Sequence, residues 1–135
     1  MPASFFDTNV LLYLASSDRM KADRAEALLG DGGAISVQVL NEVANVARRK
    51  MQMPWRDTHD FLSLLRGLLA VHPVTLETHE AGLALAERYG LSTYDAMIAA
   101  AALQAGCDTL WSEDMQHGMT LSVQLTIRDP FRGPG

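Results

Sequence analysis

Cysteine is almost absent from this sequence. Cys107 is the only one among 135 residues, so an internal disulfide and a cysteine-based zinc site are both excluded. It stands just before an apolar segment, where a small core residue is expected. The four histidines are not paired at the spacing of metal ligands: they are His59, His72, His79 and His117.

Long apolar runs are also missing. The longest, at residues 96–103, is about half of the roughly 20 residues that a membrane-spanning helix needs. The apolar N-terminal segment is too short for a signal peptide and has no basic lead. The five prolines and ten glycines are spread along the chain, without a linker or a repeat. We therefore expect one soluble domain over residues 1–135, located in the cytoplasm.

Positive charge is scarce, since 11 Lys and Arg face 16 Asp and Glu, a formal net charge of −5. This balance argues against a protein that coats nucleic acid, because such proteins are usually basic. It still allows an enzyme whose clustered carboxylates are neutralised by divalent cations. The hydrophobic fraction of 48% is ordinary and is sufficient for a packed core.

Short apolar segments alternate with amphipathic ones along the chain. The predicted strands are residues 3–6, 34–37, 71–74, 109–111 and 123–127. The predicted helices are residues 10–15, 20–29, 38–49, 57–69, 77–89 and 93–105, and residues 128–135 are predicted as coil. Pro73 cannot donate to a strand ladder, which favours an edge position for the third strand. The alternation predicts a three-layer α/β/α domain with a mainly parallel sheet of about five strands.

The first apolar segment, residues 3–6, ends on an acid. Such a segment is typical of a strand buried on both faces, in the middle of a parallel sheet. Asp7, Thr8 and Asn9 then lead into a helix. In open α/β sheets the site lies beyond the carboxyl ends of the strands, which places the Asp7 carboxylate well for chemistry. The alternative is that Asp7 or Thr8 merely caps the helix.

Two further acids lie near the starts of predicted helices. Glu42 is one turn into the helix that follows the second strand, at the flank of its apolar stripe. A contact with Arg49 is the structural alternative. Asp95 lies in the first turn of an apolar helix, where the helix dipole favours an acid. A capping box with Ser92 is the alternative there.

The fourth acid, Asp114, follows the fourth predicted strand and is again at a carboxyl end. Glu113 is the competing candidate, and Ser112 supplies a hydroxyl beside both. The alternative is an ordinary loop acid. Asp108 precedes the same strand, so it lies at the opposite edge of the sheet and is excluded from the site.

Four acids from four separate segments can therefore open on one edge of the sheet: Asp7, Glu42, Asp95 and Asp114. Unpaired carboxylates this close would repel one another and raise one another's pKa. A site with oxygen ligands and without His or Cys favours Mg²⁺ or Mn²⁺. Such sites typically serve phosphoryl chemistry.

The chain resembles the PIN-domain ribonucleases, and most closely the VapC-type toxins of bacterial toxin–antitoxin pairs. The matching segments are FDTNVL at residues 6–11, VLNE at 39–42, LSTYDAMIAAA at 91–101 and LWSEDMQHG at 110–118. Each segment alone is a weak signal. All four in this order are fairly specific, and the resemblance covers essentially the whole chain.

The resemblance implies a metal site. Its Mg²⁺ or Mn²⁺ ligands would be Asp7, Glu42, Asp95 and Asp114, and its supporting polar groups Thr8, Asn9 and Ser112. Many relatives carry a further acid where this chain has Gln116, which leaves one bound ion as the alternative to two. Relatives are often homodimers, are silenced by an antitoxin protein whose tail enters the cleft, and cleave structured RNA.

The leading hypothesis is therefore a metal-dependent endoribonuclease. Arg49, with Arg48 and Lys50, is the candidate for contacts with RNA phosphates; a solvated helix end is the alternative. A second hypothesis is a catalytically inactive PIN-fold module that binds RNA or protein. A third is a phosphatase or a phospho-acceptor domain, but a receiver-like domain would need a late lysine, and none follows Lys50.

Overall fold

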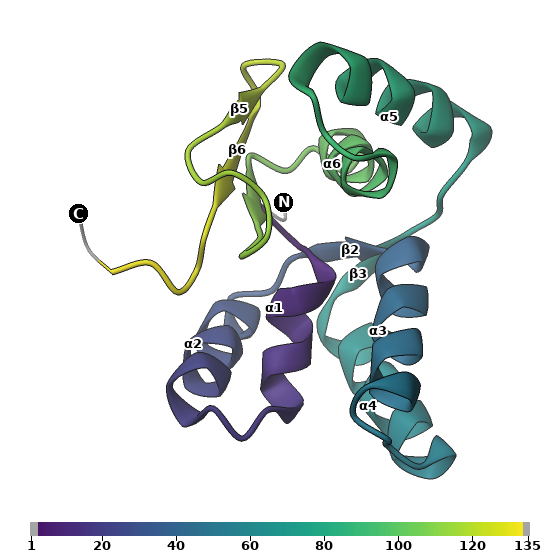
Figure 1. Cartoon of the computed structure of the whole chain (residues 1–135), viewed down its shortest axis with the longest axis vertical. Helices are drawn as coiled ribbons and strands as arrows, with labels where there is room; N and C mark the ends of the chain where they lie inside the picture. The colour runs from purple at the N-terminus through teal and green to yellow at the C-terminus, as the bar shows by residue number, and fades with distance from the viewer. Residues whose placement is uncertain (1–2, 134–135) are drawn as a thin grey trace.

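The computed structural model describes residues 3–133 (Figure 1). The strands are β1 (Ser4–Phe6), β2 (Ala34–Ser36), β3 (Ala70–His72), β4 (Thr109–Trp111), β5 (Thr120–Leu121) and β6 (Leu125–Arg128). The helices are α1 (Thr8–Leu12), the 3₁₀ turn η1 (Tyr13–Ala15), α2 (Arg19–Gly30), α3 (Val37–Arg49), α4 (Trp55–Leu68), α5 (Leu76–Tyr89) and α6 (Thr93–Gln104). Strands and helices alternate along most of the chain, as predicted.

One sheet holds all six strands in the order β3-β2-β1-β4-β6-β5. Every neighbouring pair is parallel except β5 with β6. Strand β1 is central: Phe5 is in register with Ala34 of β2 and with Leu110 of β4. The phenyl rings of Phe5 and Phe6 are fully buried, on opposite faces of the sheet. The carboxyl ends of β1, β2 and β4 therefore meet at one edge.

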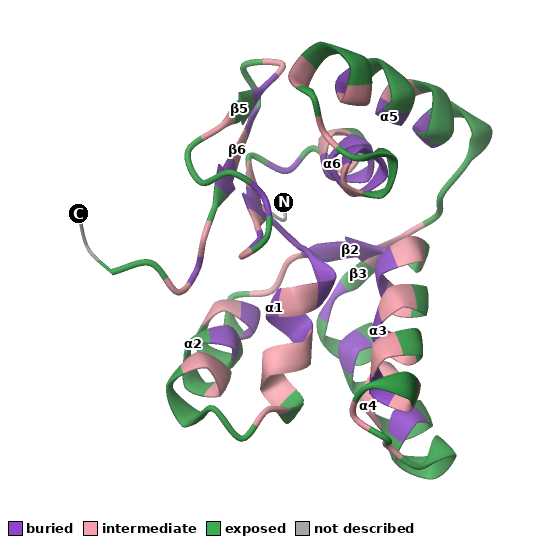
Figure 2. Cartoon of the chain, in the orientation of Figure 1, coloured by how far each residue is buried: buried purple, intermediate pink, exposed green. Residues whose placement is uncertain are grey.

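Helices cover both faces of this sheet. In Figure 1, α6 lies above β2 and α3 lies below it, and both contact that strand. Helix α6 is buried from residue 96 to residue 102 because it lies between the sheet and α5, whose outer side is exposed (Figure 2). Gly82 of α5 permits this close packing, since a Cβ there would lie 2.5 Å from Met97 Sδ. The predicted three-layer α/β/α architecture is confirmed.

Two predictions at the C-terminal end were wrong. The predicted strand 123–127 begins only at Leu125, because Val123 lies in a tight turn with φ 51° and is 93% exposed. Strand β5 was missed, since two residues are too short to show an alternating pattern. Arg128 belongs to β6 instead of the predicted coil, and residues 134 and 135 of that coil lie outside the described range.

The third predicted strand, 71–74, is observed at Ala70–His72, so Pro73, from which its edge position was argued, lies outside it. Strand β3 is at the edge of the sheet, and Cys107 is a core residue whose burial raises the pKa of its thiol to about 11. Within residues 3–133, no helix combines the length and apolar character required to cross a bilayer.

Gly33, at the start of β2, is a sensitive point of the sheet. A Cβ there would lie 2.9 Å from the Ser4 carbonyl oxygen and 2.6 Å from Phe6 Cε2, and its φ is +151°. We expect Gly33→Ala to lower the free energy of unfolding by about 2–3 kcal/mol, from strained backbone and displaced β1. Urea unfolding measures this, with Gly30→Ala as control, since nothing lies within 4 Å of a Cβ at Gly30. Equal stabilities would contradict the close β1–β2 contact.

Candidate functional site

Asp7 is the centre of the carboxyl edge and is only 4% exposed. Its Oδ1 accepts a hydrogen bond from the Thr8 backbone N–H at 2.7 Å. Its Oδ2 accepts from Ser112 Oγ at 2.7 Å and from Asn9 Nδ2 at 3.2 Å. Asp7 is also the N-cap of α1. The capping alternative is therefore correct, and it coexists with a place at the shared edge of the sheet.

Asn9 joins Asp7 to Asp114. Its Nδ2 donates to Asp7 Oδ2 and also to Asp114 Oδ2, the latter at 3.0 Å, while its Oδ1 accepts from the Glu113 backbone N–H at 3.1 Å. Asp114 is exposed on the loop after β4. The neighbouring Glu113 side chain turns away and pairs with Lys21. Of the two competing acids, Asp114 is the one that faces the edge.

Glu42 reaches the same region from the first half of α3. Its Oε1 accepts from Thr8 Oγ1 at 3.2 Å, and its Oε2 accepts from Gln38 Nε2 at 2.8 Å. These two contacts, and not the alternative contact with Arg49, are the hydrogen bonds of this carboxylate within residues 3–133. Gln38 Nε2 also donates to the Tyr94 carbonyl at 3.1 Å, which links α3 to the start of α6.

Sequence reasoning missed Gln38, although its spacing of four residues from Glu42 on one helix was an available signal. Gln38 holds Glu42 and ties it to the helix that carries Asp95.

Asp95 lies in the first turn of α6 and is half-buried. Its backbone N–H donates to Ser92 Oγ at 3.2 Å, so the predicted cap at Ser92 is confirmed. Asp95 lies close enough to Asp7 and to Asp114 for their carboxylates to repel one another. Capping again coexists with a position among the four acids.

Burial and like charge raise the pKa of the central acid. Burial is the largest cause and, with repulsion from Asp95 and Glu42, raises the pKa of Asp7 from 3.8 to about 6 against the opposing hydrogen bonds of Ser112 and Thr8. The pKa of Asp95 is also raised, first by burial and then by repulsion from Asp114. In the described part of the chain, the one ion pair is Lys21 with Glu113. The four acids therefore carry negative charge that no basic side chain offsets.

The donor set fits a hard divalent cation in its chemistry. Carboxylate, amide and hydroxyl oxygens are the ligands that Mg²⁺ and Mn²⁺ prefer. Over residues 3–133, however, no group of three or more His, Cys, Asp or Glu is arranged to hold an ion. Asp7, Glu42 and Asp114 are connected through Asn9, Thr8 and Ser112. Ligation by three carboxylates would therefore require side-chain rotations, for example at the exposed Asp114.

The predicted basic residues are not in contact with the acids. Arg48 Nη1 donates to the Met53 carbonyl at 2.7 Å, and its guanidinium lies 4.2 Å from the centre of the Trp55 ring. Arg49 and Lys50 are exposed at the end of α3, about 10 Å along the helix from Glu42. Gln116 is exposed on the loop after β4.

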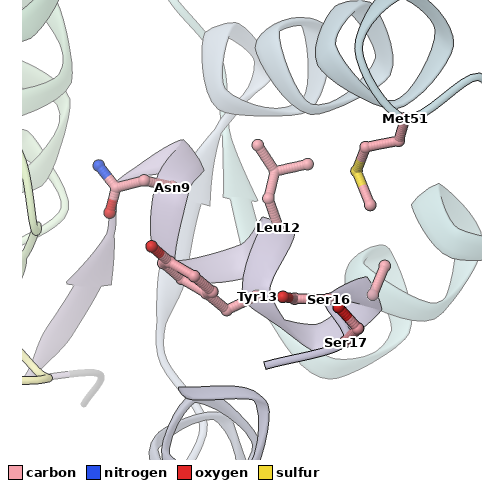
Figure 3. Close-up of a pocket in the computed structure, with 7 residues that line it drawn as sticks. Asn9, Leu12, Tyr13, Ser16, Ser17 and Met51 are labelled. Carbon is pink, nitrogen blue, oxygen red and sulfur yellow. The ribbon is translucent and has the colours of Figure 1, made fainter. Parts of the chain in front are cut away.

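A cleft of about 580 Å³ leads away from Asn9. Figure 3 shows Asn9 and Tyr13 at one side of it, Leu12 on its floor and Met51 opposite. The cleft thus extends from the acidic edge toward the basic end of α3. A second hollow, of about 400 Å³, is lined by Glu42 itself together with Gln38, Asn41, Asn45 and Tyr94.

Solved structures with this fold include proteins of toxin–antitoxin systems. A toxin–antitoxin complex from Klebsiella pneumoniae has a chain with 24% identity and a TM-score of 0.70, covering 95% of this chain and 98% of that one. VapC20 from Mycobacterium tuberculosis, described as a sarcin-ricin loop cleaving toxin, has 20% identity and a TM-score of 0.68, covering 82% and 89%. VapBC2 from Rickettsia felis, bound to promoter DNA, has 19% identity and a TM-score of 0.66, covering 93% and 96%.

At these low identities, the TM-scores show a shared fold. No curated protein sequence is significantly similar to this chain. The model of the PIN domain matches residues 4–117, a range that contains all four acids and most of the chain. The chain belongs to the PIN domain family.

Proposed function

We propose that this protein is a metal-dependent endoribonuclease that hydrolyses RNA phosphodiester bonds and acts as the toxin of a toxin–antitoxin pair. The observation that carries the proposal is the gathering of four carboxylates from four separate segments. Asn9, Thr8 and Ser112 link three of them, Asp7, Glu42 and Asp114, by hydrogen bonds. The fourth, Asp95, lies close enough to Asp7 and Asp114 for their charges to repel. Membership of the PIN family and the fold shared with an RNA-cleaving toxin support it.

Asp7, Asp95 and Asp114 would hold Mg²⁺ or Mn²⁺, with Glu42 as a further ligand. The ion, when bound, would supply a Lewis acid that activates water and offsets charge on the phosphate. Asn9 and Ser112 orient the Asp7 and Asp114 carboxylates through their hydrogen bonds. Gln116 cannot add a carboxylate, so the proposal includes one tightly held ion.

The remaining groups would act on the RNA and on water. Glu42, which accepts hydrogen bonds from Thr8 and Gln38, would orient a water whose oxygen attacks the phosphorus in line. The opposite P–O bond would break, and the proton lost by the water would be balanced by a proton taken up by the leaving oxygen from solvent. The cleft beside Asn9 offers a path for the strand. Arg49 and Lys50 would contact phosphates, whereas Arg48 is held by Met53 and Trp55.

The proposal extends to protein partners. A toxin of this type would be silenced by its cognate antitoxin, as the description of one structural neighbour as a toxin–antitoxin complex suggests. A homodimer is the expected assembly. Helix α4 leaves apolar surface for it, since Leu64 is 53% and Leu68 is 47% exposed.

A catalytically inactive binding module is the second candidate. It is favoured by the absence, within residues 3–133, of three acids already arranged around one point. Metal binding and RNA cleavage together separate the two candidates.

The proposed activity predicts RNA cleavage. With Mg²⁺ or Mn²⁺, the purified protein should cut a labelled cellular RNA pool at defined positions, and EDTA should abolish the cuts. Asp7→Asn and Asp95→Asn should each reduce the cleavage rate by more than about 100-fold. Loss of a residue that only supports a metal ligand costs up to about 100-fold, and loss of a ligand itself should cost more. Gel analysis of the labelled fragments measures this.

Asp60→Asn is the matched control, because Asp60 is an exposed acid on α4, and it should cleave like the wild type. Protein that binds Mn²⁺ and leaves every RNA intact would favour the binding module. Cleavage that survives in EDTA would refute the metal dependence.

A further prediction concerns how the free energy of unfolding depends on pH. A buried acid with a raised pKa keeps its proton in the folded state after the unfolded chain has released it, so stability falls as pH rises between the two pKa values. For Asp7 that window is 3.8 to about 6, and a shift of this size corresponds to at most about 3 kcal/mol. In EDTA, the stability of Asp7→Asn relative to the wild type should rise by up to about 3 kcal/mol between about pH 4 and about pH 6, because the variant lacks the titrating carboxylate.

Urea unfolding across this pH range tests the prediction. Added Mn²⁺ should stabilise the wild type through binding to the folded state, and should do so far less in Asp7→Asn. An identical pH dependence in both proteins would show that the pKa of Asp7 is not raised in the folded protein.

A further inference from the structure

Asp114 differs from the other three acids in what holds it. Glu42 and Asp95 lie in helices and the buried Asp7 caps α1, whereas Asp114 is exposed on the irregular segment between β4 and β5. Its carboxylate accepts one hydrogen bond from the described part of the chain, that of Asn9 Nδ2 at 3.0 Å. The position of Asp114 therefore depends on what fixes its loop.

The neighbouring residue, Glu113, anchors this loop. Its backbone N–H donates to Asn9 Oδ1. Its side chain accepts from Tyr13 Oη at 2.7 Å and from Lys21 Nζ, and Lys21 Nζ also donates to Tyr13 Oη at 3.1 Å. Contacts from α1, η1 and α2 thus converge on the residue beside Asp114.

The C-terminal segment covers this anchor. The Phe131 ring lies edge-on to the Tyr13 ring at 4.7 Å, and Lys21 Nζ is 5.0 Å from the centre of the Phe131 ring. Arg24 Nε donates to the Pro130 carbonyl at 2.9 Å. The aromatic cover partly shields the ion pair, whose Lys21 and Glu113 side chains are 32% and 26% exposed, and so strengthens it relative to an open surface pair.

We propose that Lys21, Tyr13 and Phe131 are positioning residues that act through Glu113 to fix the loop presenting Asp114 to the shared edge. The inference rests on the proposed function in one respect, the use of Asp114 as a metal ligand. Phe131 lies beyond residues 4–117, the part matched by the PIN model, so the device includes a segment outside the family match. The competing explanation is a contact that merely stabilises α2 on the domain.

The first arm of the test is hydrogen exchange of the backbone amides in residues 112–118, measured in EDTA. Lys21→Met should increase exchange in this segment about tenfold or more, while amides of α5 and α6 keep their rates, because local opening is separate from global unfolding. Lys21→Arg retains a charged donor and should restore protection to within about threefold. Arg19→Met, an exposed change on the same helix, should leave the segment unchanged.

The second arm is Mn²⁺ affinity by calorimetry, with RNA cleavage alongside. Loss of a residue that orients a ligand typically weakens metal binding by about 10–100-fold, and we expect this range for Lys21→Met. Phe131→Ala should act in the same direction with a smaller effect. The loss should appear in kcat and in metal affinity, with recovery in Lys21→Arg.

Three outcomes decide the proposal. Loop exchange and Mn²⁺ affinity in Lys21→Met equal to those of Arg19→Met would refute it. A raised KM with unchanged kcat and unchanged loop exchange would also refute it, since Lys21 would then contact RNA directly. If the wild type neither binds Mn²⁺ nor cuts RNA, the proposed function fails; faster loop exchange in Lys21→Met would then still support the fixing of the loop by Lys21.

Discussion

The burial of one carboxylate, that of Asp7, is the constraint on which the rest of the site depends. It lies where the central strand ends and is only 4% exposed. Its ionised form is costly there unless hydrogen bonds compensate for the lost hydration. Three donors supply them: the Thr8 backbone, Ser112 and Asn9. Thr8 and Asn9 begin α1, and Ser112 follows β4. The need to satisfy Asp7 therefore fixes the start of α1 against the loop after β4.

Hydrogen bonds from the same turn bring two of the remaining acids, Asp114 and Glu42, to Asp7. Asn9 is shared between Asp7 and Asp114, and Thr8 extends from the same turn to Glu42. The three residues after β1 therefore act as a hub that determines the spacing of the acids. This hub places the Asn9 amide between the carboxylates of Asp7 and Asp114, which lowers their repulsion. Because these carboxylates face a donor, no three acids within residues 3–133 already surround one point.

Sequence reasoning predicted most of this because its signals were local. Three signals follow from short-range physics: a mainly apolar strand ending in an acid, a serine before a helix, and the alternation of strand and helical segments along most of the chain. Strand β4 was predicted to the residue. The contact of Lys21 with Glu113 was not predictable in the same way, because a partner 92 residues away in sequence leaves no periodic pattern. Gln38 is a different case, since its partner Glu42 is four residues away on the same helix and this signal was overlooked. Val123 misled the prediction, since a β-branched residue at positive φ is an exception to the preference on which the prediction relied.

The net charge of −5 and the proposed substrate oppose each other, because a cluster of acids repels an RNA backbone. A bound cation would resolve both problems together: it would relieve the repulsion that raises the pKa of Asp7 and Asp95, and it would reverse the local sign of the field at the phosphate. The uncompensated negative charge of the acids would thus both destabilise the fold without the ion and bind the ion that the reaction needs. A protein so built trades stability without the ion for function with it, as sites under electrostatic strain commonly do.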